Sequence, residues 1–363
     1  MEKRFESLDI AKCFAIFAVI ILHTIVYMPV AAVTSLLMGA TMLFFFLVTG
    51  YNYKAGRDVK TSIVKRAKRL LVPFIVYSVV INIIWALISI FADGMSIQQV
   101  MYNIKEFYMG TIGFSKTEAP TNILSCVMPY WFLLIMFLAS VIFFPIADYA
   151  LKSIKRISLI SISMLLITAL SVKFNVNLPW HIEITPAFAS ILLIGAYAGK
   201  NQILVKLQNI KGVKRAGIII LTIILTLILA ITCGSTRLVS NNIWGDLGEI
   251  SVFVSVVQGI IQFVMLVLIS ELIAGTKNVK KPFIWIGENV MHFYILHGFF
   301  GYLIIKVTGW PMLMFDREIS TDPTKIIQSF MLMGCILVCV TAWILFEKAV
   351  KGKLVSKKIA GEK

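Results

Sequence analysis

The sequence predicts an all-α, polytopic membrane protein, and its composition carries this prediction. Hydrophobic residues make up 59% of the 363 residues and charged residues only 14%, with a mean hydropathy of +0.90. Soluble domains average about 25% charged residues. The apolar excess is gathered into blocks of about 20 residues, the length that crosses roughly 30 Å of hydrocarbon. We therefore expect about ten transmembrane helices.

The apolar blocks follow one another along the whole chain. The expected spans are 10–30, 35–53, 70–91, 128–147, 157–173, 183–199, 216–233, 251–274, 283–306 and 326–348. The longest stretch outside them is 92–127, where apolar groups at helical spacing over 97–109 predict a short helix on the membrane surface. No linker or soluble appendage stands out, so we expect a single domain, 1–363, with a basic tail at about 349–363.

The net charge of +16 is explained by membrane topology. With the N-terminus in the cytoplasm, 27 of the 34 Lys and Arg residues fall on the cytoplasmic side and seven on the other side. This is the positive-inside distribution, and it argues against a nucleic-acid partner. An even number of spans then places the C-terminus in the cytoplasm as well. The Ile- and Lys-rich composition suggests a bacterial cell membrane.

Several familiar kinds of site are missing from the sequence. The five cysteines form neither a CxxC motif nor a paired pattern, so we expect no disulfide framework and no metal site. The chain also lacks a GxSxG elbow, a Walker loop and an HExxH helix. No hydrolase nucleophile suggests itself.

Three polar residues lie on one face of the first expected span. At 100° per residue, Lys12 and His23 differ by only about 20° in azimuth and lie roughly 16 Å apart along the axis. Asp9 precedes Lys12 by three residues and lies on the same side. A charge at the centre of a transmembrane helix costs about 2.5–3.5 kcal/mol on insertion scales, so the stripe should face a bundle interior or a wet cavity. It is either an interfacial ion pair with a hydrogen-bonded core histidine, or part of a functional site.

Two further features precede the third expected span. Arg66 and Arg69 are three residues apart, which puts both guanidinium groups on one helix face, and guanidinium suits bidentate contacts to phosphate. The alternative is charge that only sets topology. Upstream, Thr49-Gly50 permits close approach of either a neighbouring helix or a ligand.

The segment 286–302 contains two histidines. Glu288 and His292 are four residues apart and share a helix face, whereas His297 lies on the opposite face and pairs with Tyr294. On a straight helix the two histidines cannot face the same cavity. The spacing does not say which one faces it.

A polar group also stands at the predicted outer boundary of the membrane. Trp180 fits an aromatic belt there. The neighbouring His181 and Glu183 either anchor the chain at the interface or hold a polar acceptor.

Five motifs in order resemble those of a known family. They are Lys12 and His23 after Leu8-Asp9, the run Phe44-Phe45-Phe46-Leu47-Val48-Thr49-Gly50-Tyr51, Arg66 and Arg69 before Pro73-Phe74, Trp131-Phe132-Leu133, and Tyr294 with His297. Over nearly its whole length the chain resembles the acyltransferase-3 family of integral membrane acyltransferases. Lys12 departs from the commoner arginine, keeping the charge without the bidentate geometry, and Thr49 departs from serine.

The resemblance implies transfer of an acyl group, usually acetyl, from cytoplasmic acyl-CoA to a sugar hydroxyl of an envelope polysaccharide, oligosaccharide or glycolipid. No metal is implied. The donor-binding residues that it implies are Arg66, Arg69, Lys12, Thr49, Gly50 and Tyr51. The candidate acceptor-binding residues are Trp131, His181 and Glu183.

The resemblance also implies catalytic roles. His23 would be the general base toward the acceptor hydroxyl, or a nucleophile that carries the acyl group. Asp9 would orient Lys12. His297 or Tyr294 would stabilise the developing oxyanion or shuttle a proton.

Two other functions fit the same spans. A transporter or flippase would use Lys12 and His23 to line a translocation path, and acyl-CoA binding that depends on Arg66 and Arg69 separates it from the enzyme. A non-catalytic partner in glycan synthesis predicts that His23→Ala leaves envelope chemistry intact. No esterase-like domain follows the last span, so we expect the chain to complete the transfer itself or to hand the acyl group to a separate protein.

Overall fold

The computed structural model describes residues 5–26, 41–112, 124, 127–176, 178, 180, 182–233, 245–312 and 320–361. Within these ranges the chain is helical and contains no β-strand. The helices are α1 (Glu6–Thr24), α3 (Thr41–Tyr51), α4 (Val59–Phe91), α5 (Ile97–Ile112), α7 (Trp131–Ala150), α8 (Ile154–Lys173), α9 (Thr185–Lys200), α10 (Ile203–Gln208), α11 (Gly212–Cys233), the 3₁₀ helix η2 (Gly245–Ile250), α12 (Ser251–Ala274), α13 (Lys280–Glu288), α14 (Val290–Thr308) and α16 (Thr324–Gly361).

The all-α, polytopic prediction is confirmed. In the described part of the chain, eight helices are long and apolar enough to cross a membrane. Each of the ten expected spans overlaps a helix; 27–30 of the first span and 35–40 of the second lie outside the described residues. Helix α9 has 16 residues. The ninth expected span, 283–306, is divided between α13 and α14 at Asn289.

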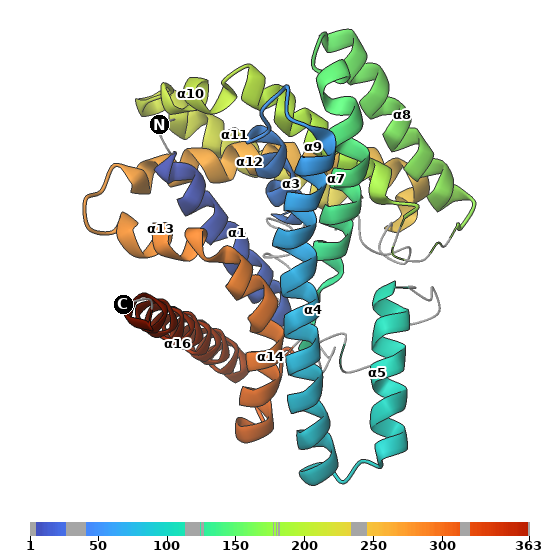
Figure 1. Cartoon of the computed structure of the whole chain (residues 1–363). Helices are drawn as coiled ribbons and strands as arrows, with labels where there is room; N and C mark the ends of the chain where they lie inside the picture. Colours follow the sequence, from blue (N-terminus) through green and yellow to red (C-terminus); the bar gives the residue numbers. More distant parts are fainter. Residues whose placement is uncertain are drawn as a thin grey trace.

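Helix α1 lies inside the bundle, as the polar stripe predicts. It packs against α3, α12, α13, α14 and α16, and Figure 1 shows it crossing behind α4. Most of its residues are buried, including Asp9. A helix surrounded by protein on its polar side shields the polar groups from lipid, which lowers the cost of carrying them.

Helices α3 and α9 approach each other very closely because glycines stand at their contact. A Cβ atom at Gly50 would lie 2.1 Å from the Leu192 carbonyl oxygen, and one at Gly195 would lie 2.3 Å from that of Leu47. Small residues let helix backbones approach in this way. Gly50 is therefore used for helix packing, one of the two alternatives that the sequence left open.

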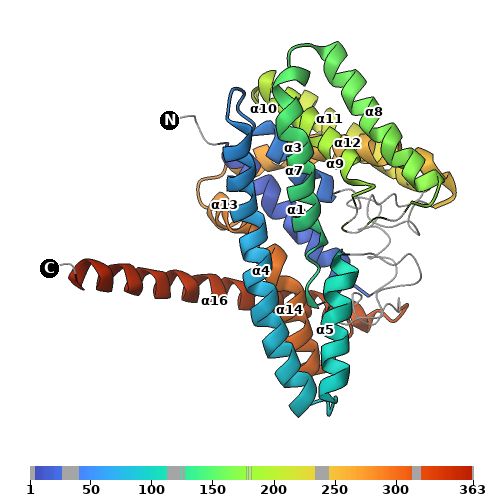
Figure 2. The same ribbon diagram turned by 45° about the vertical axis from the view of Figure 1, so that its right-hand side comes forward.

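A helix is present where one is predicted at 97–109: it is α5, which continues to Ile112. Its position on the membrane surface stays a prediction. Figures 1 and 2 both show it beside the C-terminal half of α4. Val100 and Phe107 are buried, whereas Ile97 and Met101 are largely exposed. The turn that joins α5 to α4 contains Gly94 at φ +67°, a left-handed conformation that glycine adopts without strain.

Candidate active site

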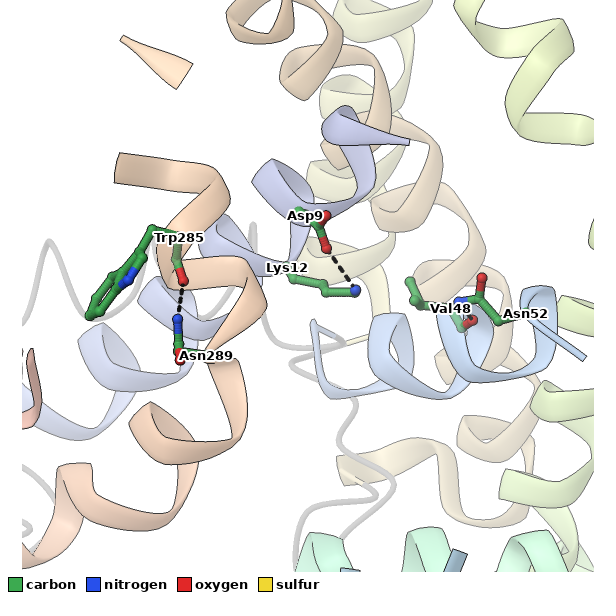
Figure 3. A network of polar contacts seen from close by, with 6 residues as sticks. All are labelled: Asp9, Lys12, Val48, Asn52, Trp285 and Asn289. Atoms are coloured by element: carbon green, nitrogen blue, oxygen red, sulfur yellow. Dashed lines mark hydrogen bonds and ion pairs between the residues drawn. The ribbon is translucent and has the colours of Figure 1, made fainter. Parts of the chain in front are cut away.

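An ion pair lies near the start of α1. Lys12 Nζ donates to Asp9 Oδ1 over 2.9 Å, and the Asp9 side chain is only 4% exposed. Figure 3 shows the Lys12 ammonium pointing from α1 toward α3, where Asn52 donates to the Val48 carbonyl. A buried carboxylate is costly unless it is paired, so each charge makes the burial of the other tolerable.

A close backbone contact fixes the position of this pair. A Cβ atom at Gly287 would lie 1.9 Å from the Asp9 carbonyl oxygen, so only glycine allows α13 to approach α1 here. One residue later, at Glu288, α13 ends, and the Asn289 side chain donates to the Trp285 carbonyl oxygen over 2.7 Å (Figure 3). Our sequence reasoning missed Gly287. The signal available was a glycine beside the polar residues Glu288 and Asn289 within an apolar span.

A basic cavity of about 810 Å³ opens next to Lys12. Its wall carries five basic side chains from α1, α4 and the segment between α3 and α4: Lys12, Arg57, Lys65, Arg66 and Arg69. We call it the basic cavity. Opposed to this charge are only Asp9, Asp58 and Glu288 among its lining residues. Such a surface attracts a polyanion, and its guanidinium groups suit phosphate.

A second cavity, of about 920 Å³, adjoins the first. The two share Asp9, Lys12, Asn52 and Tyr53 in their walls. Three further lysines line the second cavity, Lys54, Lys152 and Lys200. The Lys12–Asp9 pair therefore stands where the two basic spaces meet.

The loop between α3 and α4 is held by one carboxylate. Tyr53 donates its hydroxyl to Asp148 Oδ1 over 2.8 Å, and the Gly56 N–H donates to Oδ2 over 3.0 Å. Burial, reinforced by the Asp148 carboxylate, raises the pKa of Tyr53. The Tyr53 ring packs against Phe144, over which the Arg66 guanidinium lies 5.9 Å from the ring centroid. Asp148 thus positions a wall of the basic cavity.

Two histidines that are distant in the sequence meet in the interior. The rings of His23 on α1 and His297 on α14 are stacked, with centroids 5.3 Å apart and planes inclined by 25°. Nδ1 of His297 lies 2.8 Å from the Tyr294 carbonyl oxygen and 3.1 Å from that of Phe293. Carbonyl oxygens only accept, so Nδ1 carries the hydrogen and Nε2 carries the lone pair. His297 Nε2 is buried and has no hydrogen-bond partner among the described residues.

Tyr294 stands between the basic cavity and this histidine pair. It lines the cavity, and its hydroxyl donates to the Pro129 carbonyl oxygen. Its ring centroid is 6.0 Å from that of His297. At Tyr294 the wall of the basic cavity is therefore one aromatic ring away from His297.

The fold shows which histidine of α14 faces His23: it is His297. His292 points instead toward α16, where its Nε2 lies 3.2 Å from Glu347 Oε2. Tyr77 on α4 donates to the same carboxylate oxygen over 3.2 Å. Glu288, which the spacing put on the face of His292, lines the basic cavity, because α13 ends before α14 begins.

The remaining predicted donor residues divide between the two cavities. Thr49 lines the basic cavity and Tyr51 the adjoining one, whereas Gly50 packs against α9.

The predicted acceptor residues are not gathered at the histidines by any contact in the described part of the chain. Trp131 packs edge-to-face with Phe132. Glu183 is buried and accepts from the Leu178 N–H over 3.2 Å, and His181 lies outside the described residues. Among the described residues no three His, Cys, Asp or Glu side chains gather into a group that could hold a metal ion.

This fold and site define a multi-span membrane protein with a basic cavity beside a pair of stacked imidazoles, of which His297 is fully buried and His23 partly buried. The family model described as "Acyltransferase domain" matches residues 5–347, nearly the whole chain. The chain therefore belongs to the acyltransferase-3 family, and it is a membrane acyltransferase. No curated protein and no solved structure matches the chain significantly.

Proposed function

We propose that this protein is an O-acyltransferase of a bacterial plasma membrane that takes acetyl from cytoplasmic acetyl-CoA. The acceptor in this proposal is a hydroxyl of an envelope polysaccharide, oligosaccharide or glycolipid. The proposal rests on one observation: the basic cavity extends from its five basic side chains to Tyr294, whose ring is next to that of His297. A donor that is anionic at one end and carries its thioester at the other fits such a path.

The charge of the basic cavity supports CoA as the donor. CoA carries a diphosphate and a 3′-phosphate, and Arg66, Arg69 and Lys12 are fixed cations in one wall. Arginine binds phosphate through paired N–H groups, whereas Lys12 acts as a point charge held by Asp9. The pantetheine arm then extends toward Tyr294 and brings the thioester to the histidines.

The imidazole pair supports general-base chemistry. An imidazole nitrogen of His23 takes the proton of the acceptor hydroxyl while its oxygen attacks the thioester carbonyl carbon. The tetrahedral intermediate collapses, the C–S bond breaks, and the proton passes to the departing CoA thiolate. The ester is formed and the imidazole is regenerated. The free lone pair of His297 Nε2 provides a second proton acceptor beside His23.

A covalent variant of the same chemistry uses His23 as the nucleophile. The acetyl group would move from sulfur to an imidazole nitrogen and then to the acceptor oxygen. The C–S bond breaks as the N–C bond forms, and CoA leaves as the thiolate. When the acceptor oxygen attacks the acetyl carbon, the N–C bond breaks, and His297 Nε2 takes the hydroxyl proton and passes it to the CoA thiolate. Radiolabelled acetyl that becomes attached to the protein without acceptor, and leaves the protein when acceptor is added, identifies this variant.

The test of the donor assignment is acetyl-CoA binding to the purified protein in nanodiscs. Loss of one charge-assisted hydrogen bond costs about 1.5–3 kcal/mol, which is about ten- to a hundredfold in Kd. We expect this loss in Arg66→Gln and Arg69→Gln. Arg156→Gln is the matched control, because its guanidinium lies over the Tyr149 ring and lines neither cavity. Equal acetyl-CoA binding by the wild type and the three variants would contradict the donor assignment.

The acceptor assignment is tested by NMR of envelope glycans from a deletion strain. We expect ester acetyl signals when wild-type protein is restored and none when His23→Ala is expressed at the same level. The position of the ester then identifies the sugar and its hydroxyl. Glycans whose ester content does not change on deletion would contradict the acceptor class.

A further inference from the structure

A second group of polar side chains is buried on the inner face of α4, away from the basic cavity. Asn82 donates to the Tyr108 hydroxyl of α5 over 3.1 Å, and that hydroxyl lies 3.4 Å from Ser78 Oγ. Trp85 follows Asn82 by three residues, so it lies on the same face of α4. Trp85 and Asn82 are 0% and 5% exposed.

Three polar atoms of this region have no hydrogen-bond partner among the described residues. They are Asn82 Oδ1, Trp85 Nε1 and the Tyr130 hydroxyl oxygen. Buried polar groups are almost always hydrogen-bonded, so three unpartnered atoms in one region require an explanation. Two of the three groups can donate and two can accept, which is the mixture that hydroxyl groups satisfy.

Tyr130 joins this group to the reaction centre. Its side chain is fully buried and lies near those of Tyr294, Tyr77 and Tyr108. The residue before it, Pro129, accepts the hydrogen bond of Tyr294, whose ring faces His297. The group is thus one tyrosine away from the histidine pair.

The chemistry of this group differs from that of the basic cavity. Its amide, indole and phenol groups are uncharged, whereas the basic cavity carries five basic side chains. It therefore does not suit phosphate. Aromatic rings with polar edges suit the alternating apolar faces and hydroxyls of a sugar ring.

We propose that Asn82, Trp85, Tyr108 and Tyr130 form the binding site for the hydroxyl groups of the carbohydrate acceptor. This inference rests on the proposed function and adds to it a site separate from that of the donor. The donor reaches the histidines through the basic cavity, and the acceptor reaches them from the α4–α5 side. The four residues come from α4, α5 and the position just before α7, so the acceptor in this proposal contacts all three segments.

The test uses variants that remove one polar atom and keep the ring. Tyr130→Phe meets this condition, because it removes only a hydroxyl that bonds to nothing in the described protein. Trp85→Phe removes the indole N–H together with part of the ring, so its Kd is compared with its thermal unfolding midpoint. The probe is envelope polysaccharide purified from cells that lack this protein, so that its hydroxyls are unacylated. Its Kd for the full-length protein in nanodiscs is measured beside the Kd for acetyl-CoA. Tyr149→Phe, on the exposed side of α7, is the matched control.

We expect the Kd for polysaccharide to rise about tenfold or more in Tyr130→Phe, the loss of one hydrogen bond to a ligand that has no replacement. The Kd for acetyl-CoA should stay at the wild-type value, and the thermal unfolding midpoint should not fall below that of wild type. An unchanged Kd for polysaccharide with a lowered unfolding midpoint would mean that Tyr130 holds only a buried water. That result, or the absence of polysaccharide binding by wild type, would overturn the inference.

The same preparations separate this inference from the proposed function. Acetyl transfer from acetyl-CoA to the polysaccharide by wild-type protein reports on the function, whereas the Kd of the variants reports on the site. If wild-type protein transfers acetyl but both variants bind the polysaccharide with the wild-type Kd, the acceptor site is overturned and the proposed function is not. Binding that depends on Tyr130 without any transfer would overturn the reaction and leave the site in place.

Discussion

The rings of His23 and His297 are stacked 5.3 Å apart, although 273 residues separate them in the chain. The contact joins the polar stripe of α1 to the inner face of α14. His297 is oriented by two backbone carbonyl oxygens, which leave its Nε2 lone pair free in the described structure. The basic cavity reaches within one aromatic ring of His297, through Tyr294.

The first prediction concerns the three histidines in helices α1 and α14. His23→Ala and His297→Ala should each reduce acetyl transfer by about 10²- to 10⁴-fold, the range for loss of a general acid or base. His292→Ala is the control, because that side chain contacts Glu347 rather than the pair. Transfer is measured with radiolabelled acetyl-CoA at saturating donor. Full activity of His297→Ala would restrict the chemistry to His23.

Helical periodicity accounts for what the sequence could predict about this site. The spacing of Asp9, Lys12 and His23 depends only on 100° per residue, so their common face follows from local geometry. Accordingly Lys12 lines a cavity and His23 meets a polar partner. The ten apolar blocks fall on helices for a similar reason, since each one is defined by its own composition.

Tertiary packing decides what the sequence could not predict. Whether His292 or His297 faces α1 depends on where α16 places Glu347 and on the break at Asn289, and neither is a local property. The contact of Gly287 with Asp9 joins residues 278 positions apart. Such contacts leave no periodic trace in a single sequence, so a glycine that permits a close approach looks like any other glycine.

The second prediction concerns the Lys12–Asp9 ion pair, which lies where the two cavities meet. Asp9→Asn keeps the shape of the side chain but removes the charge that balances Lys12, whose side chain is 24% exposed. We expect the free energy of unfolding to fall by about 1.5–3 kcal/mol, the value of a hydrogen bond to a charged group. The KM for acetyl-CoA should rise because the ammonium is no longer directed toward the cavity. Asp9→Asn with Lys12→Met should recover stability but not the KM, which thermal unfolding and steady-state kinetics distinguish.

The third prediction concerns the close approach of α13 to α1. Gly287→Ala puts a methyl group 1.9 Å from the Asp9 carbonyl oxygen, so one backbone must shift. Overpacking of this kind costs about 1–3 kcal/mol, and the shift should displace Lys12 and lower activity. Gly334→Ala in α16 is the control: nothing lies within 4 Å of the added methyl group, and alanine is the better helix former. Equal unfolding midpoints for the two variants would contradict the packing argument.

The last prediction concerns Asp148, which binds the loop between α3 and α4 through Tyr53 and Gly56. Asp148→Ala should release this loop and raise the KM for acetyl-CoA, with a smaller effect on kcat, because the loop forms a wall of both basic spaces and does not touch the histidines. Asp322→Ala is the matched control: its carboxylate also accepts a backbone N–H, that of Thr324, but it lines neither cavity.

The hydrogen bond from Tyr53 to Asp148 also predicts that stability depends on pH. The folded-state pKa of Tyr53 lies above its unfolded value of about 10, so its stabilising effect is complete below that pH and is lost as the pH rises through the folded-state value. Wild-type protein should therefore lose more stability than Tyr53→Phe between about pH 9 and 11, as followed by thermal unfolding, and parallel curves for the two proteins would contradict the role assigned to the Tyr53–Asp148 hydrogen bond.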